Sequence, residues 1–182
     1  MSCRLRSLRE VIMSTVLVSV FCSDRTGLVA AITGRLFDLG ADLGDTSFAM
    51  LGSGAEFTSV CELPASVSAG EVQDDLGRLP ALAGARISVR AFEMDAAHGP
   101  AGTITHRVVV SGGDRPGLVA RLSEVFGEFQ ANIVRMDAQR LPEQGIYVTR
   151  FSVAIPARAE ACLTTVANTA EEMNLACAVE AV

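Results

Sequence analysis

The sequence is poor in the residues from which catalytic and metal sites are most often built. Its 182 residues include two histidines, one tyrosine and no tryptophan. The five cysteines are an odd number without Cys-x-x-Cys spacing, which is typical of small buried side chains in a reducing compartment. With so few histidines, the sequence predicts no metal site.

Long apolar runs and an excess of positive charge are also missing. No apolar run approaches the roughly 20 residues that a membrane-spanning helix requires. Fifteen Lys and Arg against 21 Asp and Glu give a net charge of −6. An acidic surface repels phosphate backbones, which disfavours direct nucleic-acid binding. Regulation of transcription through contact with another protein stays open.

Recognisable catalytic motifs are absent as well. The chain has no Gly-x-Ser-x-Gly, His-Glu-x-x-His or P-loop pattern. The Gly-Ser-Gly at 52–54 is better interpreted as a hairpin turn than as a phosphate-binding loop. The sequence therefore predicts a protein that is not an enzyme, with no catalytic residues and no cofactor.

The first 13 residues differ from those that follow. The stretch MSCRLRSLREVI carries three arginines, lacks the long apolar segment of a secretory signal, and precedes a second methionine, Met13. We expect residues 1–13 to form a disordered extension, with Met1 or Met13 as the start of translation. A short mitochondrial-type presequence is the alternative, and the remaining sequence predicts a cytoplasmic protein.

The most informative feature that is present is an internal repeat. DRTGLVA at 24–30 returns as DRPGLVA at 114–120, 90 residues later. The strand-like stretches FTSVCELP and TRFSVAIP end at Pro64 and Pro156, so the second copy has two extra residues before this point. Repetition over most of the chain predicts two homologous domains. We place them at 14–95 and 103–182, joined by the turn-rich linker 96–102.

Both copies predict the same order of secondary-structure elements. β-branched runs open each copy, and apolar residues then take helical spacing after the repeated loop. The first copy predicts strands at 14–21, 43–50, 56–63 and 85–92, and a second helix at 68–79. The second copy predicts strands at 104–111, 133–140, 147–155 and 175–181, and a second helix at 158–173.

This βαββαβ order predicts an α+β protein made of two tandem ferredoxin-like domains. Each domain is a four-stranded antiparallel sheet with both helices on one face. The expected strand order is 4-1-3-2. It places the apolar first strand in the centre of the sheet and the polar second strand at an edge, where charge is tolerated.

The repeated loop lies between the central strand and the first helix of each copy. A helix N-terminus presents free N–H groups and the positive end of the helix dipole, so it suits a carboxylate. Gly27 and Gly117 lack a Cβ and allow close approach. Asp24 and Asp114 supply a carboxylate that pairs with an ammonium group. Together these groups match the two charged ends of a free amino acid.

A purely structural interpretation of the loop is equally open. Aspartates before a helix commonly cap its first turn, which would be the role of Asp24 and Asp114. Arg25 and Arg115 are typical of solvated surface residues. We also expect Pro116 at the first helical position, where its missing N–H costs nothing.

These residues resemble the ACT domain family, which comprises small βαββαβ modules that bind amino acids and regulate metabolism. The family has an Asp-Arg-Pro-Gly-Leu-like loop, followed by a small-Asn-Ile start to strand 2. Here these motifs read DRTGLVA with ADL (41–43), and DRPGLVA with ANI (131–133). Two tandem copies without an enzyme resemble the glycine cleavage system transcriptional repressor group. That group implies a response to glycine and action on a DNA-binding activator protein.

The resemblance also implies where a ligand binds. In the family, ligands lie where domains pair, between the loop of one domain and strand 2 of another. By position, this nominates one set of residues in each copy: Asp24, Gly27 and Asp42, and Asp114, Gly117 and Asn132. Thr26 and Asp42 depart from the family pattern, so we expect the site in the second copy. For Asn132, a local turn hydrogen bond is the alternative.

The implied partners are a small free amino acid such as glycine and a regulated protein, either a transcriptional activator or a metabolic enzyme. A homo-oligomer is expected. Two alternatives stay open: a ligand-free module that dimerises through its edge strands, and a regulatory fragment of an enzyme of amino-acid metabolism. The sequence leaves open the ligand's identity and whether the two copies pair within one chain or between chains.

Overall fold

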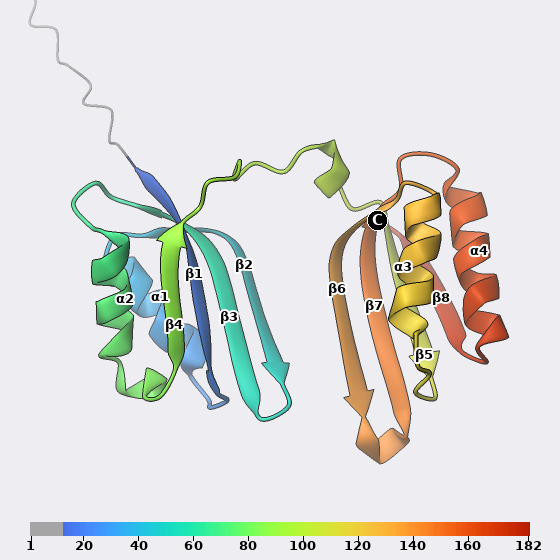
Figure 1. Ribbon diagram of the computed structural model, residues 1–182, viewed down its shortest axis with the longest axis horizontal. Helices are drawn as coiled ribbons and strands as arrows, with labels where there is room; N and C mark the ends of the chain where they lie inside the picture. The colour runs from blue at the N-terminus through green and yellow to red at the C-terminus, as the bar shows by residue number, and fades with distance from the viewer. Residues whose placement is uncertain (1–12) are drawn as a thin grey trace, which may run out of the picture. The chain divides into compact units, whose positions relative to one another are not determined.

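The predicted order of strands and helices occurs twice along the chain (Figure 1). The computed structural model describes residues 13–182, so the expectation for the N-terminal extension lies, apart from Met13, outside the described residues. The chain divides between Ala96 and Ala97 into two units. Each unit has its own sheet and its own core.

The first unit is an antiparallel sheet with the strand order β2-β3-β1-β4. This order confirms the predicted 4-1-3-2 arrangement. Because β1 pairs with β3 on one side and β4 on the other, the most apolar strand is central. Its elements are β1 (Ser14–Ser23), α1 (Leu28–Asp38), β2 (Asp42–Leu51), β3 (Gly54–Leu63), α2 (Ala69–Gly77), the 3-10 turn η1 (Pro80–Leu82) and β4 (Arg86–Ala91).

The second unit repeats this topology with the order β6-β7-β5-β8. Helices α3 and α4 cover one face of its sheet (Figure 1). The expected pair of ferredoxin-like domains is therefore confirmed. Its elements are β5 (His106–Gly112), α3 (Leu118–Glu128), β6 (Asn132–Leu141), the 3-10 turn η3 (Pro142–Gln144), β7 (Ile146–Ala154), α4 (Ala159–Glu172) and β8 (Ala176–Ala181).

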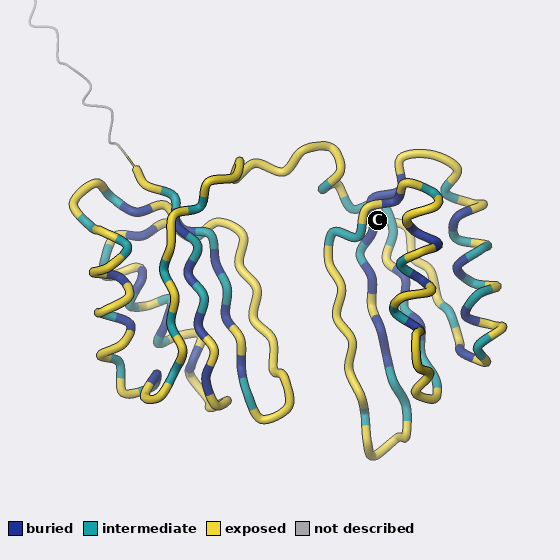
Figure 2. The backbone as a smooth tube through the Cα atoms, viewed as in Figure 1, coloured by how far each residue is buried: buried dark blue, intermediate teal, exposed yellow. Residues whose placement is uncertain are grey.

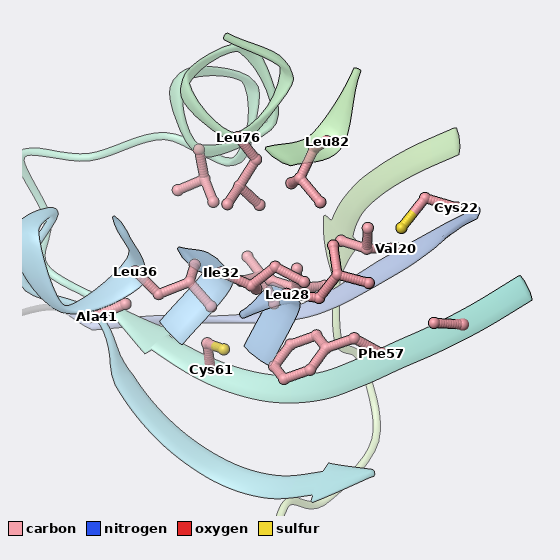
Figure 3. Packing of buried hydrophobic residues seen from close by; sticks show 14 of the residues in the cluster. Val20, Cys22, Leu28, Ile32, Leu36, Ala41, Phe57, Cys61, Leu76 and Leu82 are labelled. Atoms are coloured by element: carbon pink, nitrogen blue, oxygen red, sulfur yellow. The ribbon is translucent and has the colours of Figure 1, made fainter. Parts of the chain in front are cut away.

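The core of the first unit is built from buried residues that recur every second position on β1 and every fourth position on α1. Alternate residues of β1 point toward the helices and are buried, as Val18 is, while their neighbours face away. On α1, Leu28, Ile32 and Leu36 recur every four residues and meet the same layer (Figure 3). Burying each such side chain contributes about 1.5–3 kcal/mol, which holds the helix against the sheet.

The core of the second unit is built on two phenylalanines. The rings of Phe126 on α3 and Phe151 on β7 lie 5.3 Å apart at a tilted angle, and both are buried. The equivalent residues of the first unit are Leu36 and Ser59. The two units therefore fill one backbone arrangement with different side chains.

The second strand of each unit is its outer edge, as expected. β2 and β6 each pair with only one neighbour and are exposed over most of their length (Figure 2). Both have an irregular register near their start, between Leu43 and Thr46 and between Ile133 and Arg135. Such irregularities and the charged residues on these strands limit unwanted strand pairing.

The segment expected to be a plain linker contains a short 3-10 helix, η2 (Pro100–Gly102). The Asn132 side chain at the start of β6 donates a hydrogen bond to the Ala101 carbonyl at 2.7 Å. This bond ties η2 to the second unit. Sequence patterns did not predict the helix, because Gly-Pro-Ala-Gly is equally typical of an irregular turn.

Candidate functional site

The two repeated loops have almost the same backbone geometry. Gly27 has φ 89° and ψ 1°, and Gly117 has φ 83° and ψ 1°. Each is the N-cap of the helix that follows, and neither helix has a side-chain cap. A left-handed φ favours glycine over any residue with a Cβ. The repeated glycine is therefore a requirement of the backbone, in both copies.

The capping role considered for Asp24 and Asp114 is wrong. Glycine occupies the N-cap in each copy, and no side chain accepts a bond from the first turn. For the same reason Pro116 precedes the cap and does not hold the first helical position. The backbone N–H of Asp24 instead donates to the Ser53 carbonyl at 3.0 Å, which anchors the loop to the β2–β3 turn.

The first loop borders a shallow hollow of about 260 Å³, lined by residues 24–30 and by Phe48 of β2. Phe48 is 42% exposed and lies on the helix side of the sheet edge, because it pairs with the core residue Phe57. Among the described residues, the Asp24 carboxylate has no ion-pair partner. The hollow thus offers the Asp24 carboxylate, the Arg25 side chain and the amide end of α1.

The second loop carries both signs of charge. An Arg140 guanidinium N–H donates to the Asp114 carboxylate at 2.5 Å, and both side chains are more than half exposed. Arg140 lies on β6, and the residue at the equivalent position of β2 in the first copy is Met50. The sequence reasoning missed Arg140. Its place on the helix side of the sheet follows only from the register of the β6–β7 hairpin.

A second residue that the sequence reasoning missed is Thr149 of β7. It is fully buried, and within the described part of the chain its hydroxyl has no hydrogen-bond partner. Thr149 pairs with Val110 and Ala138, close to the end of the sheet that carries the second loop. The equivalent residues of Thr149 and Ala138 in the first copy are Phe57 and Phe48. Two aromatic rings near the first loop are thus replaced by small side chains near the second.

Within one copy, the predicted site residues do not all come together. The loop lies at the end of the sheet where Ser23 pairs with Gly54, whereas Asp42 pairs with Glu62 at the other end. The length of β2 separates the two by about 30 Å. In the second copy, Asn132 is likewise at the far end of β6 from Gly117. Asp24 with Gly27, and Asp114 with Gly117, are the groups that each copy does bring together.

Asn132 and Asp42 have different surroundings. Asn132 donates to the linker carbonyl of Ala101, so its amide is engaged outside its own strand and not in a local turn. Asp42 borders a small hollow of about 130 Å³ that also contains Asp45 and Glu62. The acidic surroundings of Asp42 disfavour a carboxylate ligand there.

Reactive chemistry finds little support among residues 13–182. Burial raises the pKa of the thiols of Cys61, Cys162 and Cys177, which keeps them protonated and weakly nucleophilic. Within that range, no group of three His, Cys, Asp or Glu residues is placed to hold a metal ion. In the same residues, no helix has the length and apolar character needed to cross a membrane.

The fold and the loops define the class: an α+β protein of two tandem ferredoxin-like domains, each with a glycine-capped loop between its central strand and first helix. Two solved structures match the fold over nearly the whole chain. An "unknown protein" from Galdieria sulphuraria is 24% identical, with a TM-score of 0.67, over 93% of this chain and 99% of that one.

The second similar structure has the provisional name of glycine cleavage system transcriptional repressor. It is 13% identical to this chain, with a TM-score of 0.62, and 94% and 98% of the two chains are covered. No protein-family model and no curated protein sequence matches the chain. At these identities the likeness confirms the expected tandem-ACT resemblance at the level of the fold.

Proposed function

We propose that the protein is a non-enzymatic regulator that binds a small free amino acid and controls another protein by direct contact. The observation that carries this proposal is the repeated loop. In both copies, a left-handed glycine opens a helix whose first-turn amides receive no side-chain cap, beside an aspartate that does not cap it. A helix N-terminus without a cap and a nearby carboxylate complement the two ends of an amino acid.

The second copy is the preferred site. Asp114 and Arg140 already lie together at the loop, so a ligand can exchange their mutual ion pair for contacts with its own charges. Its ammonium group would pair with Asp114, and its carboxylate would accept bonds from Arg140 and from the amides that follow Gly117. The first copy has Met50 at the edge-strand position of Arg140, so Asp24 lacks this cation and we expect weaker binding there.

A role for Asn132 requires pairing of two of these edge strands, in spite of the irregular registers and charges that limit it. Because the loop and Asn132 lie at opposite ends of β6, antiparallel pairing of two such edges would bring the start of one strand beside the loop of the other. Asn132 would then offer a donor and an acceptor to a ligand at the neighbouring loop. The same argument assigns Asp42 of β2 to a loop that is not its own.

Glycine is the first ligand to test. One protein that shares the fold carries a name that refers to glycine cleavage. The regulated partner would be a transcriptional activator or a metabolic enzyme. The net charge of −6 favours a protein partner over direct contact with DNA.

A ligand-free interaction module is the second candidate. Phe48, Met50 and Leu51 at the end of β2 are each more than 40% exposed. Exposed apolar side chains on an edge strand favour association with another chain. In that case strand pairing alone would be the function, and the loops would serve only to start the helices.

A ligand panel distinguishes the two candidates. The melting temperature of the full chain is measured with each of the free amino acids, and binding of any that stabilises it is then measured by calorimetry. We expect one small amino acid to stabilise the protein. The Asp114→Asn and Asn132→Ala variants should lose most of that effect, whereas Asp24→Asn, the matched change in the first copy, should keep most of it.

The outcomes separate the proposals clearly. No stabilisation by any amino acid at millimolar concentration contradicts the binding proposal and supports the interaction module. Stabilisation that is lost in Asp24→Asn but kept in Asp114→Asn places the site in the first copy. That result would overturn the assignment of the second loop.

A further inference from the structure

The fourth strand of each unit forms the second edge of its sheet. The outward-facing backbone groups of this strand have different surroundings in the two units. In the first unit, the backbone N–H of Val89 on β4 donates to the side-chain oxygen of Gln73 on α2 at 3.1 Å. The Phe92 N–H, three residues on, donates in the opposite direction to β1. Val89 therefore points its N–H toward the outside of the sheet, and the Gln73 side chain accepts the hydrogen bond that another strand would otherwise accept.

Among residues 13–182, no hydrogen bond closes the equivalent edge of the second unit. The Val182 N–H donates inward to Thr105, so alternate residues before it, Cys177, Val179 and Ala181, direct their N–H and C=O groups outward. Val179 pairs with Val108 as Val89 pairs with Val18. The residue equivalent to Gln73, at the fifth position of its helix, is Leu163. A leucine side chain cannot accept the Val179 N–H.

The remaining edges carry further protection that β8 lacks. β2 and β6 have irregular registers and several charged residues, and β4 carries Arg86 and Arg90. The sequence of β8, ACAVEA, has one charge, Glu180, which lies 3.9 Å from Arg107 of the neighbouring β5. Natural sheets use charges, irregularities or covering groups to prevent edge pairing, so an edge without them is suited to pairing.

We propose that β8 is a homodimerisation edge, where the β8 strands of two copies of this chain pair in antiparallel fashion about a two-fold axis at Val179. A second copy is the partner because the edge is complementary to itself. In this register Val179 meets Val179, Cys177 meets Ala181, and Ala178 meets Glu180 of the other copy. No two glutamates lie opposite each other, and Glu180 remains paired with Arg107 of its own copy. The contact between the two β8 strands therefore has no uncompensated charge.

The pairing satisfies groups that are otherwise left to water. Each outward N–H and C=O of Cys177, Val179 and Ala181 would exchange hydrogen bonds with the second copy. The Val179 side chain, 43% exposed, would be covered by its equivalent. The result is one continuous eight-stranded sheet built from two second units. This interface does not depend on the amino-acid site, so either proposal can fail without the other.

Sedimentation equilibrium of the full chain tests the interface. We expect the natural sequence to have twice the mass of one chain. Leu163→Gln introduces at β8 the side chain that accepts the Val89 N–H in the first unit. It should halve the measured mass to that of one chain. Val179→Pro should do the same, because it removes only the outward N–H and leaves the bonds to β5 in place. The matched changes Gln73→Ala and Val89→Pro in the first unit should not lower the mass.

The register is tested by oxidation of the Ala181→Cys variant. Directly opposite residues of a hydrogen-bonded antiparallel pair have Cα atoms about 5.5 Å apart, which permits a disulfide. We expect Cys177 of one copy to link to position 181 of the other, giving a covalent dimer that Leu163→Gln abolishes. Ala178→Cys, on the other face of β8, is the control and should not form a covalent dimer.

Two results would overturn the proposal. One is a monomeric natural chain, and the other is a dimer that persists in both Leu163→Gln and Val179→Pro. Because the two variants act on different elements, failure of one to fold, as judged by circular dichroism, leaves the other as the test.

Discussion

The two units share a backbone and differ in what they place at the same positions. On β3 of the first unit, Phe57 faces the helices next to the loop, and Ser59 lies buried two residues further on, bonded to Thr46 at 2.7 Å. On β7 of the second unit the order is reversed, with Thr149 next to the loop and Phe151 further on. At these two positions the aromatic ring lies further from the loop in the second unit, while Tyr147, the equivalent of Ala55, adds a ring at the loop end of β7.

The side chains around the two loop aspartates differ as well. Asp24 of the first loop lies beside a hollow bordered by Phe48 and has no ion-pair partner among the described residues, whereas Asp114 of the second loop is paired with Arg140. What the loops share is the left-handed glycine that starts each helix. The loop backbone is therefore common to both copies, whereas the side chains around it differ.

The largest expected effect is on the aromatic core of the second unit. Phe151→Ala removes a buried ring that packs on Phe126 and should lower the free energy of unfolding of the second unit by about 3–5 kcal/mol. Urea unfolding followed by hydrogen exchange resolves the two units. An equal loss in the first unit would contradict the description of two separate cores.

The shared glycines should give nearly equal effects in the two units. Gly27→Ala and Gly117→Ala each force a left-handed φ on a residue with a Cβ, at a cost of about 1–2 kcal/mol. A Cβ at either position meets no atom within 4 Å, so the cost is conformational and not steric. Unfolding midpoints of the two variants measure it. A loss in only one variant would mean that the two loops are not equivalent.

Replacing the buried polar residue of each core with an apolar one should change the free energy of unfolding in opposite directions. Thr149→Val removes a buried hydroxyl that lacks a partner, and should stabilise the second unit by about 1 kcal/mol. Ser59→Ala removes the Thr46–Ser59 hydrogen bond, and should destabilise the first unit by about the same amount. Urea denaturation of both variants checks the signs. Destabilisation by Thr149→Val would show that its hydroxyl is satisfied.

The smallest effect concerns acid stability. Bonds from the backbone N–H and hydroxyl of Ser68 lower the pKa of Glu71 below its ordinary value at the start of α2. A lowered folded-state pKa gives stability that is present above the unfolded pKa, about 4.3, and is lost as the pH falls through the folded value. Helix α4 has no such cap, since Arg158 occupies that position.

The matched variant for this prediction is Glu71→Gln. Its first unit should lose less stability on acidification than that of the natural chain, while the second unit should behave identically in both. The measurement is the urea midpoint of each unit as the pH is lowered. Identical pH profiles for the two proteins would contradict the role of the Ser68–Glu71 capping box.

The fold was predictable because it depends on patterns that are local in sequence. The period-two run of β1 and the four-residue spacing of Leu28, Ile32 and Leu36 identified their elements, and the repeat then fixed the topology. The 3-10 helix η2 was missed because it is held by Asn132, a contact across 31 residues.

The site was only partly predictable. The glycines of the repeated loop were found, but the capping role considered for the aspartates was wrong, because a left-handed glycine takes the cap position. Arg140 and Thr149 were missed, since their places depend on the pairing register of β6 and β7. Register sets which face a strand residue occupies, and a polar strand such as β6 specifies it weakly.

The central claim is that the second loop binds the charged ends of an amino acid, and amide NMR tests it most directly. The account predicts that titrating glycine, or the amino acid found in the panel, shifts the backbone amide signals of Leu118, Val119 and Ala120 at the start of α3. The equivalent signals of Leu28, Val29 and Ala30 should move less, and Asp114→Asn should abolish the shifts. Saturating ligand that leaves the amides at the start of α3 unmoved would contradict the account.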